Sequence, residues 1–362
     1  MKKVILILSA AAAIAACTKN EVIPASSNEN AEITFNVAPK TKADADKTQK
    51  FDTNNVFASW AYYLPSGKTW EANRLDSDAV QYIDNSTVSY QSTDNVWKNS
   101  DNTYYWPKVG SLTFFAYSLN KGDLELKHIT SQSHVTCYDS AESYGVNGLI
   151  DLDENPNTDF LVAQISADQR GNTSIYGYNG VPMLFRHRLS RVAFAVKLAG
   201  NYTNSKFTLN SIKFNKLCYA IHYDQFHKYE DGTFAEYAKQ GDNRSTQVYT
   251  QKPMEITSLD KFVGVPAENE ERYIYTPQVF KDETSDDKIA NIEVNYTLTA
   301  TVGGKQVTEN CTSVIDVKDY FESWEMGKRY TINLTFGLDE ILWAPAVEDW
   351  EDVAGKGVTI EK

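Results

Sequence analysis

The clearest candidate for chemistry in this sequence is Cys17. Lys2 and Lys3 precede an apolar run, residues 4–16, that ends in small residues directly before the cysteine. A positive start, a short apolar segment and small residues before a cut are typical of a secretory signal peptide. The run is shorter than the about 20 residues that a membrane-spanning helix needs. The pattern predicts a signal peptide over residues 1–16 and acylation of Cys17.

A second candidate site is the acidic series in residues 151–159. Its oxygen-bearing side chains alternate as they do at the start of a calcium-binding loop, namely Asp151, Asp153, Asn155, Asn157 and Asp159. However, Pro156 stands where an EF-hand needs glycine, and Val162 stands where it needs a bidentate glutamate. The sequence therefore favours a solvated surface loop over a metal site.

The histidines and the short motifs do not indicate catalysis. His222 and His227 are expected on opposite faces of a strand, which argues against a shared zinc site. His187 suits a polar contact at a strand edge or between domains. The chain has no H-E-x-x-H, G-x-S-x-G, P-loop or G-x-G-x-x-G motif. We expect no enzyme activity, no cofactor and no metal.

The other cysteines are Cys137, Cys218 and Cys311. Three distant cysteines allow one disulfide at most, so this is not a disulfide scaffold. We expect all three to be buried small hydrophobes, and their pairing state stays open. The aromatic residues of the first half could either line a carbohydrate-binding face or pack in a core, and their β-strand setting favours the core. These residues are Trp60, Tyr62, Tyr63, Trp70, Trp97 and Trp106.

Composition limits the partners. The chain has 362 residues and a formal net charge of −13. An acidic surface argues against binding nucleic acid and against binding anionic membranes by charge. Attachment to a membrane must therefore come from lipid on Cys17. Stable anchoring takes more than one acyl chain, which a lipoprotein cysteine supplies.

The elements that would position these residues are strands. Residues 291–302 alternate apolar and polar side chains, and Gly303-Gly304 then suits a two-residue hairpin turn. Residues 111–117 are apolar on both faces, which predicts a central strand. A shift in the alternation predicts a bulge near residues 210–211, and residues 96–107 are expected to form a hairpin. Outside residues 1–16 no helical pattern of comparable length occurs, so the chain is predicted to be all-β.

Several stretches resemble the fimbrillin family, the FimA-type (type V) pilin-like lipoproteins. The resemblance rests on five motifs in the family's order, beginning with the cysteine and a first strand at residues 32–39. The others are the segments Tyr105-Trp106-Pro107 with residues 112–117, Leu184–Val192, Trp324–Gly327 and Ile341–Trp350. The family typically has Asp-Pro where this chain has Ala344-Pro345.

The resemblance implies two tandem transthyretin-like β-sandwich domains. The expected division is a signal peptide (1–16), a tether (17–31), an N-terminal domain (32–178) and a C-terminal domain (179–362). It also implies that a protease removes the first strand, so that a strand of the next subunit fills the groove by β-augmentation. The groove-filling candidates are Ile33, Phe35 and Val37. No arginine precedes Arg74, so the candidate processing sites are Lys40, Lys42, Lys47 and Lys50.

The resemblance leads to a functional prediction with one alternative. The chain is expected to be a fimbrial subunit or accessory adhesin at the cell outer membrane, held by lipid on Cys17. Its expected partners are other fimbrillin subunits, and surface glycans or proteins are further candidates. The alternative is a surface lipoprotein that binds glycans and never polymerises.

Overall fold

The computed structural model describes residues 31–37, 49–125, 135–153, 155–156, 158–168, 180–267, 274–338, 340–349 and 353–354. Across these residues regular structure is almost entirely strand, with one short helix, α2 (Trp70–Asn73), and a 3₁₀ turn at Val317–Asp319. None of the helices in this part of the chain is long and apolar enough to cross a membrane. The predicted all-β fold class is confirmed.

The first body contains an eight-stranded sheet that curls around a core. Its strands, in sheet order, are β10 (Val181–Pro182), β1 (Phe35–Asn36), β5 (Val96–Asn99), β4 (Val80–Gln91), β3 (Phe57–Leu64), β6 (Ser111–Ser118), β9 (Leu161–Ala167) and β11 (Arg186–His187). The Phe35 ring of β1 contacts Phe57 of β3 and Phe114 of β6, although neither strand pairs with β1. The sheet therefore folds over far enough to place β1 opposite β3 and β6.

A second layer covers the other face of this sheet. It has the order β15 (Phe234–Gln240), β14 (Ala220–Lys228), β8 (Ser143–Asp151) and β7 (Thr136–Asp139). Side chains of both layers, such as Phe115 and Tyr223, share one buried cluster. β14 pairs with β8, and β10 pairs with β1, so strands from beyond residue 179 complete this body. The division at residues 178/179 stays a prediction, and the strand pairs β1–β10, β9–β11 and β8–β14 all cross it.

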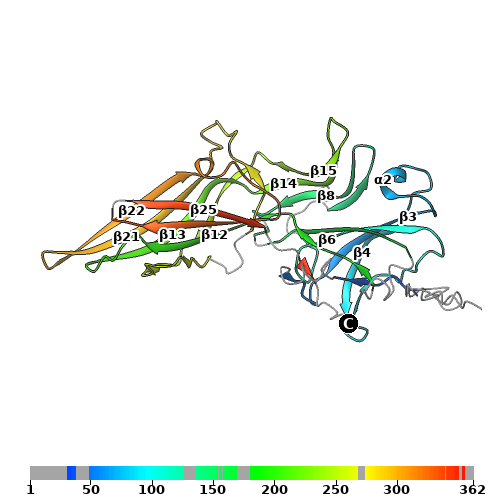
Figure 1. The fold of residues 1–362 in the computed structure, drawn as a ribbon, viewed down its shortest axis with the longest axis horizontal. Coiled ribbons are helices and arrows are strands. Elements are labelled where there is room, and N and C mark those ends of the chain that lie inside the picture. Colours follow the sequence, from blue (N-terminus) through cyan, green and yellow to red (C-terminus); the bar gives the residue numbers. More distant parts are fainter. Residues whose placement is uncertain are drawn as a thin grey trace, which may run out of the picture.

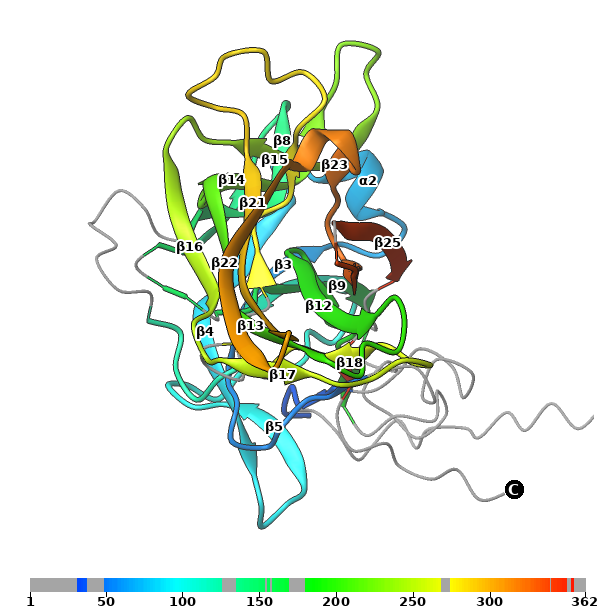
Figure 2. The same ribbon diagram turned by 90° about the vertical axis from the view of Figure 1, so that its left-hand side faces the viewer.

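The second body is two packed sheets (Figure 1). One has the order β18 (Val263–Gly264), β12 (Ser190–Leu198), β24 (Lys328–Phe336), β25 (Ile341–Asp349), with β19 (Ile274–Tyr275) also on β12. The other has the order β16 (Arg244–Thr250), β13 (Ser205–Cys218), β21 (Asn291–Val302), β22 (Lys305–Asp316), with β17 (Met254–Ile256) also on β13. Phe194 and Ile332 of one sheet and Phe214 and Val294 of the other share a core. Figure 2 looks onto this body from its far end.

Two short pairs lie outside these four sheets. β2 (Gln49–Lys50) runs parallel to β26 (Val353–Ala354), and β20 (Gln278–Val279) runs antiparallel to β23 (Ser323–Trp324).

Local patterns explain several of these elements. β6 lies between β3 and β9, as its two apolar faces predicted. The register of β13 against β21 shifts between Leu209 and Ser211, which confirms the predicted bulge. Gly303 and Gly304 have φ values of 59° and 77°, the left-handed pair that a type I′ hairpin turn requires.

Candidate functional site: the first strand and its groove

The candidate site is the place of the first strand, residues 31–37, inside the curled sheet. Phe35 of β1 pairs antiparallel with Trp97 of β5 and parallel with Val181 of β10. Since β1 has a strand on each side, it is an interior strand of the sheet. Of the strand predicted at residues 32–39, the structure describes residues 32–37, with strand β1 at Phe35–Asn36 and an isolated bridge from Glu32 to Tyr105.

Backbone hydrogen bonds hold this segment along both sides. On one side the Ile33 amide donates to the Tyr104 carbonyl at 2.8 Å, and the Trp106 amide donates to the Ala31 carbonyl at 2.8 Å. On the other side the amides of Val181 and Met183 donate to the carbonyls of Thr34 and Asn36, each at 2.7 Å. The hairpin expected over residues 96–107 is wrong, because β5 pairs with β4 and residues 104–106 instead bond the first strand.

The alternate side chains of the segment fill the core of the first body. Ile33, Phe35 and Val37 are at most 1 % exposed. The Phe35 ring meets Phe57 and Phe114 edge-on at 5.6 Å between ring centroids. Burial of three such side chains contributes about 1.5–3 kcal/mol each. The predicted groove-filling role of these residues is untested, but their burial is the geometry that such a role needs.

Gly180 makes room for the first strand. Its φ of +104° lies in the region that side-chain-bearing residues rarely adopt. A Cβ at this position would lie 2.8 Å from the backbone carbonyl carbon of Phe35 and 2.9 Å from its nitrogen. The sequence analysis did not single out Gly180 for this role. The signal was the glycine itself, directly before a strand.

Phe51, directly after β2, lies in the same core as the first strand. Phe51 is fully buried and stacks on Phe185 with a centroid distance of 5.3 Å and an interplanar angle of 10°. Its ring also contacts Phe57 and Trp97. Sequence reasoning missed this anchor because a single phenylalanine after a polar stretch has no periodicity.

The candidate processing sites lie between these two fixed points in the sequence. Lys50 is the last residue of β2, while Lys40, Lys42 and Lys47 lie outside the described residues, as does Cys17. A cut at any of the four would divide the chain between the first strand and Phe51. The strand would then be held by its non-covalent contacts alone.

Charge contributes little to the hold on the first strand. Its Glu32 carboxylate lies 3.2 Å from the Lys98 ammonium, which also bonds Asp94 at 2.8 Å. The hydrogen bonds that Lys98 donates to the carboxylates of Asp94 and Glu32 raise its pKa. The Glu32–Lys98 pair is partly exposed, and such a pair contributes about 0–1 kcal/mol. Side-chain burial and backbone pairing therefore hold the first strand in the groove.

The acidic loop differs from its prediction. Asn155, Thr158 and Asp159 are each 4 % exposed, so the expectation of a solvated loop is wrong for them. Asp159 Oδ2 lies 2.8 Å from Nδ1 of buried His187, which links the loop to β11. β11 is an edge strand, as expected for His187. In the described part of the chain no three potential ligands come close enough to hold a metal ion.

The remaining candidates have structural surroundings. Trp60, Trp70, Trp97 and Trp106 are at most 4 % exposed, which confirms core packing over a glycan-binding face for these four. His227 lies 3.3 Å from Asp224 and stacks on Tyr237, and a register shift separates it from His222 on β14.

Within the described residues no disulfide forms, and Cys137, Cys218 and Cys311 are free thiols. Cys218 is buried, and its thiol donates to the Ala220 carbonyl at 3.0 Å. Cys137 and Cys311 are half-buried, so the expectation of full burial is wrong for them. Burial nevertheless raises the pKa of the Cys137 thiol, which makes it a poor nucleophile.

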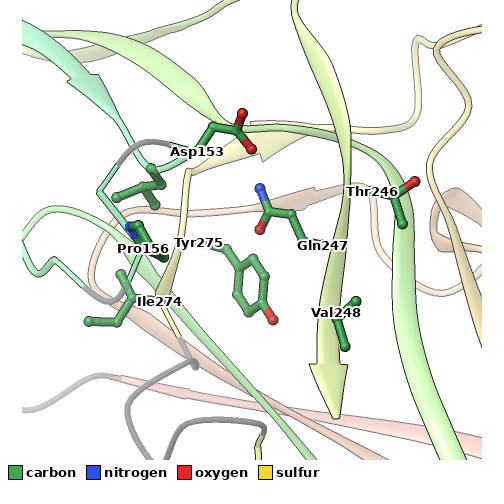
Figure 3. A pocket seen from close by; sticks show the side chains of 8 residues that line it. Asp153, Pro156, Thr246, Gln247, Val248, Ile274 and Tyr275 are labelled. Carbon is green, nitrogen blue, oxygen red and sulfur yellow. The ribbon is translucent and has the colours of Figure 1, made fainter. Parts of the chain in front are cut away.

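A small cavity lies where the loop after β8 meets β16 and β19 (Figure 3). Its volume is about 150 Å³, and Asp153, Gln247 and Tyr275 are among the lining residues. Sites for small molecules usually have about 300–1,000 Å³. The cavity can hold a few waters and does not provide a site for an oligosaccharide.

Fold and groove together define a class, an all-β protein of stacked sheets whose first strand is enclosed between β5 and β10. A family profile of fimbrillin-like proteins matches residues 41–350. The chain belongs to the fimbrillin-like family, a family of fimbrial proteins.

Among the solved structures that resemble this chain, one has the same fold. A fimbrial protein from Bacteroides vulgatus is 16 % identical with a TM-score of 0.61, and the match covers 89 % of this chain and 100 % of that one. A putative cell adhesion protein from Bacteroides uniformis is 14 % identical with a TM-score of 0.46, covering 89 % and 99 %. The C-terminally truncated tip fimbrial protein Mfa3 from Porphyromonas gingivalis is 10 % identical with a TM-score of 0.29, covering 88 % and 100 %. A search of curated proteins found no match.

Proposed function

We propose that this chain is a subunit or accessory adhesin of surface fimbriae that assembles by strand exchange after proteolysis. A protease cuts between the first strand and Phe51, the strand leaves, and an extended segment of a neighbouring subunit takes its place. The observation that carries this proposal is the enclosed first strand, with three alternate buried side chains and backbone partners on both sides. An incoming strand would find the same backbone groups and pockets.

The first strand also has a protective role under this proposal. With the strand gone, β5 and β10 would face an empty slot of unpaired backbone groups and apolar side chains. Such an opening promotes uncontrolled association. Keeping the strand until the chain reaches the surface delays assembly until neighbours are present.

The trimming experiment treats the purified full-length chain with a lysine-specific protease, then follows N-terminal sequences and unheated electrophoresis. We expect a new N-terminus between residues 38 and 51, followed by a ladder of high-mass species resistant to detergent. A synthetic peptide of residues 31–38 should suppress the ladder, and the same peptide with Phe35→Ala should suppress it less. Both peptides compete for the slot, but only the first fills the Phe35 pocket.

A variant with glutamine at Lys40, Lys42, Lys47 and Lys50 is the control, and it should stay monomeric after the same treatment. The proposal fails if the trimmed chain loses its first strand and still runs as a monomer. It also fails if the four-lysine variant polymerises as well as the natural chain.

Anchoring is the second part of the proposal. Cys17 would carry the lipid that holds the chain at the outer membrane, because the net charge of −13 gives no attraction to anionic lipid. A Cys17→Ser chain should lose incorporation of labelled palmitate and leave the membrane fraction. Unchanged palmitate labelling in this variant would contradict the assignment.

The glycan-binding alternative has less support. The four tryptophans that could form a sugar-stacking face are buried, and the cavity lined by Asp153 and Gln247 is too small for an oligosaccharide.

A further inference from the structure

The ends of the four large sheets differ in how well they are protected. Exposed edge strands invite pairing with other chains, and proteins protect them by shortness, proline or bulges. β10, β11 and β18 have 2 residues each and β7 has 4. β25 carries Pro345, and the pairings of β15 and β16 contain register shifts.

β22 lacks the short length, the proline and the bulges of the other edges, and its charged residues are Lys305, Glu309 and Asp316. It has 12 residues, contains no proline, and pairs with β21 from Val302↔Lys305 to Asn291↔Asp316 without a register shift. Within the described residues β21 is its one strand partner. Val307 and Val314 are 54 % and 53 % exposed. The β21–β22 hairpin projects at the end of the molecule far from β3 and β4, where another chain can reach it (Figure 1).

We propose that β22 is a docking edge for a second copy of this chain, paired antiparallel to the same strand of that copy. A two-fold axis perpendicular to the sheet places residues of the same face opposite each other. With the axis at Cys311, Val307 lies opposite Ile315 of the second copy, and Thr308 lies opposite Val314. Gln306 faces Asp316, Glu309 faces Ser313, and Asn310 faces Thr312. No like charges oppose each other, so this acidic chain has a self-complementary edge.

This register brings the two copies of Cys311 together. Directly opposite residues of antiparallel strands lie roughly 4.5–5.5 Å apart between Cα atoms, within the range of a disulfide. Cys311 is half-buried and forms no disulfide within the described chain. A disulfide at Cys311 would thus detect the pairing, whereas the argument for the pairing comes from the exposed edge of β22. The contact lies on the second body, so it does not depend on replacement of the first strand.

The test is oxidative cross-linking of the purified full-length chain at micromolar concentration, with non-reducing electrophoresis. We expect a disulfide-linked dimer that Cys311→Ser abolishes and that Cys137→Ser and Cys218→Ser leave unchanged. In a Cys311→Ser background, Asn310→Cys combined with Thr312→Cys should restore the dimer from the other face. Absence of a Cys311-dependent dimer, or failure of this restoration, overturns the proposal.

A charge swap tests the register of the paired edges, with the Cys311 cross-link as its readout. T308K with V314K places lysines opposite each other twice, and opposed like charges should reduce cross-linking by roughly tenfold. Mixing this chain with one carrying T308E and V314E should restore cross-linking to at least the natural level. Both positions are exposed, and equal thermal midpoints will show that the variants fold. Cross-linking that both charge variants leave unchanged contradicts the register.

Discussion

The first strand and β25 are opposite kinds of strand. β1 is assigned only 2 residues, yet its segment bonds backbone groups on both sides and its alternate side chains are fully buried. β25 has 9 residues, pairs with β24 alone, and leaves Leu342 and Val347 more than half exposed. The number of residues in a strand therefore does not show how much the strand contributes to stability. Enclosure on two sides and side-chain burial determine that.

Truncation of one side chain in each region tests this comparison with the largest expected effect. Phe35→Ala in the uncut chain should reduce the free energy of unfolding by about 3–5 kcal/mol, because it leaves a cavity against Phe57 and Phe114. Leu342→Ala should change it by no more than about 0.5 kcal/mol, since the side chain is 54 % exposed. Urea unfolding followed by tryptophan fluorescence measures both.

Equal losses in the free energy of unfolding for Phe35→Ala and Leu342→Ala would contradict this comparison. A further check is Phe51→Ala, which removes a fully buried ring from the same core but from the segment after the candidate cuts. Its cost should persist after trimming, whereas the cost of Phe35→Ala should disappear with the strand. A Phe35→Ala cost that survives loss of the strand would mean that the ring acts through some other part of the fold.

Local pattern predicted the parts of the fold that depend on neighbours in sequence. Alternation identified the long strands of the second body, two glycines identified the β21–β22 turn, and the two apolar faces of residues 111–117 placed β6 centrally. A short first strand was also predicted this way, whereas its three inward residues were named from the family resemblance. In each case the deciding physics, side-chain period or turn conformation, lies within about a dozen residues.

The pairing partners of the first strand could not be predicted this way. Residues 104–106 look like a hairpin arm, but they bond residues 31–33 some seventy positions earlier. The distant pairing forms in place of the hairpin because it gives hydrogen-bond partners to backbone groups of both segments. The acidic loop was misjudged for the same reason, since its buried Asp159 depends on His187 from a distant strand.

Glycine substitution gives the finer test of the enclosed strand. Gly180→Ala should destabilise the uncut chain by about 2–4 kcal/mol, the sum of a strained φ and a methyl group driven against the backbone of Phe35. Gly232→Ala is the matched control, because Gly232 also has a positive φ, +83°, with no atom within 4 Å of the added Cβ. It should cost only about 1–2 kcal/mol. The difference between the two, measured by urea unfolding, isolates the contact with the first strand.

The difference in the free energy of unfolding between the two variants also shows whether a strand occupies the groove beside position 180. When the first strand has left the groove, the methyl group at position 180 no longer clashes with the backbone of Phe35. The two substitutions should then lower the free energy of unfolding by the same amount. When another strand occupies the slot along the same path, the difference should return, and assembly of the Gly180→Ala chain should be slower than that of the Gly232→Ala chain. An incoming strand that assembles equally well on both variants would have to follow a different path from the one β1 takes between β5 and β10.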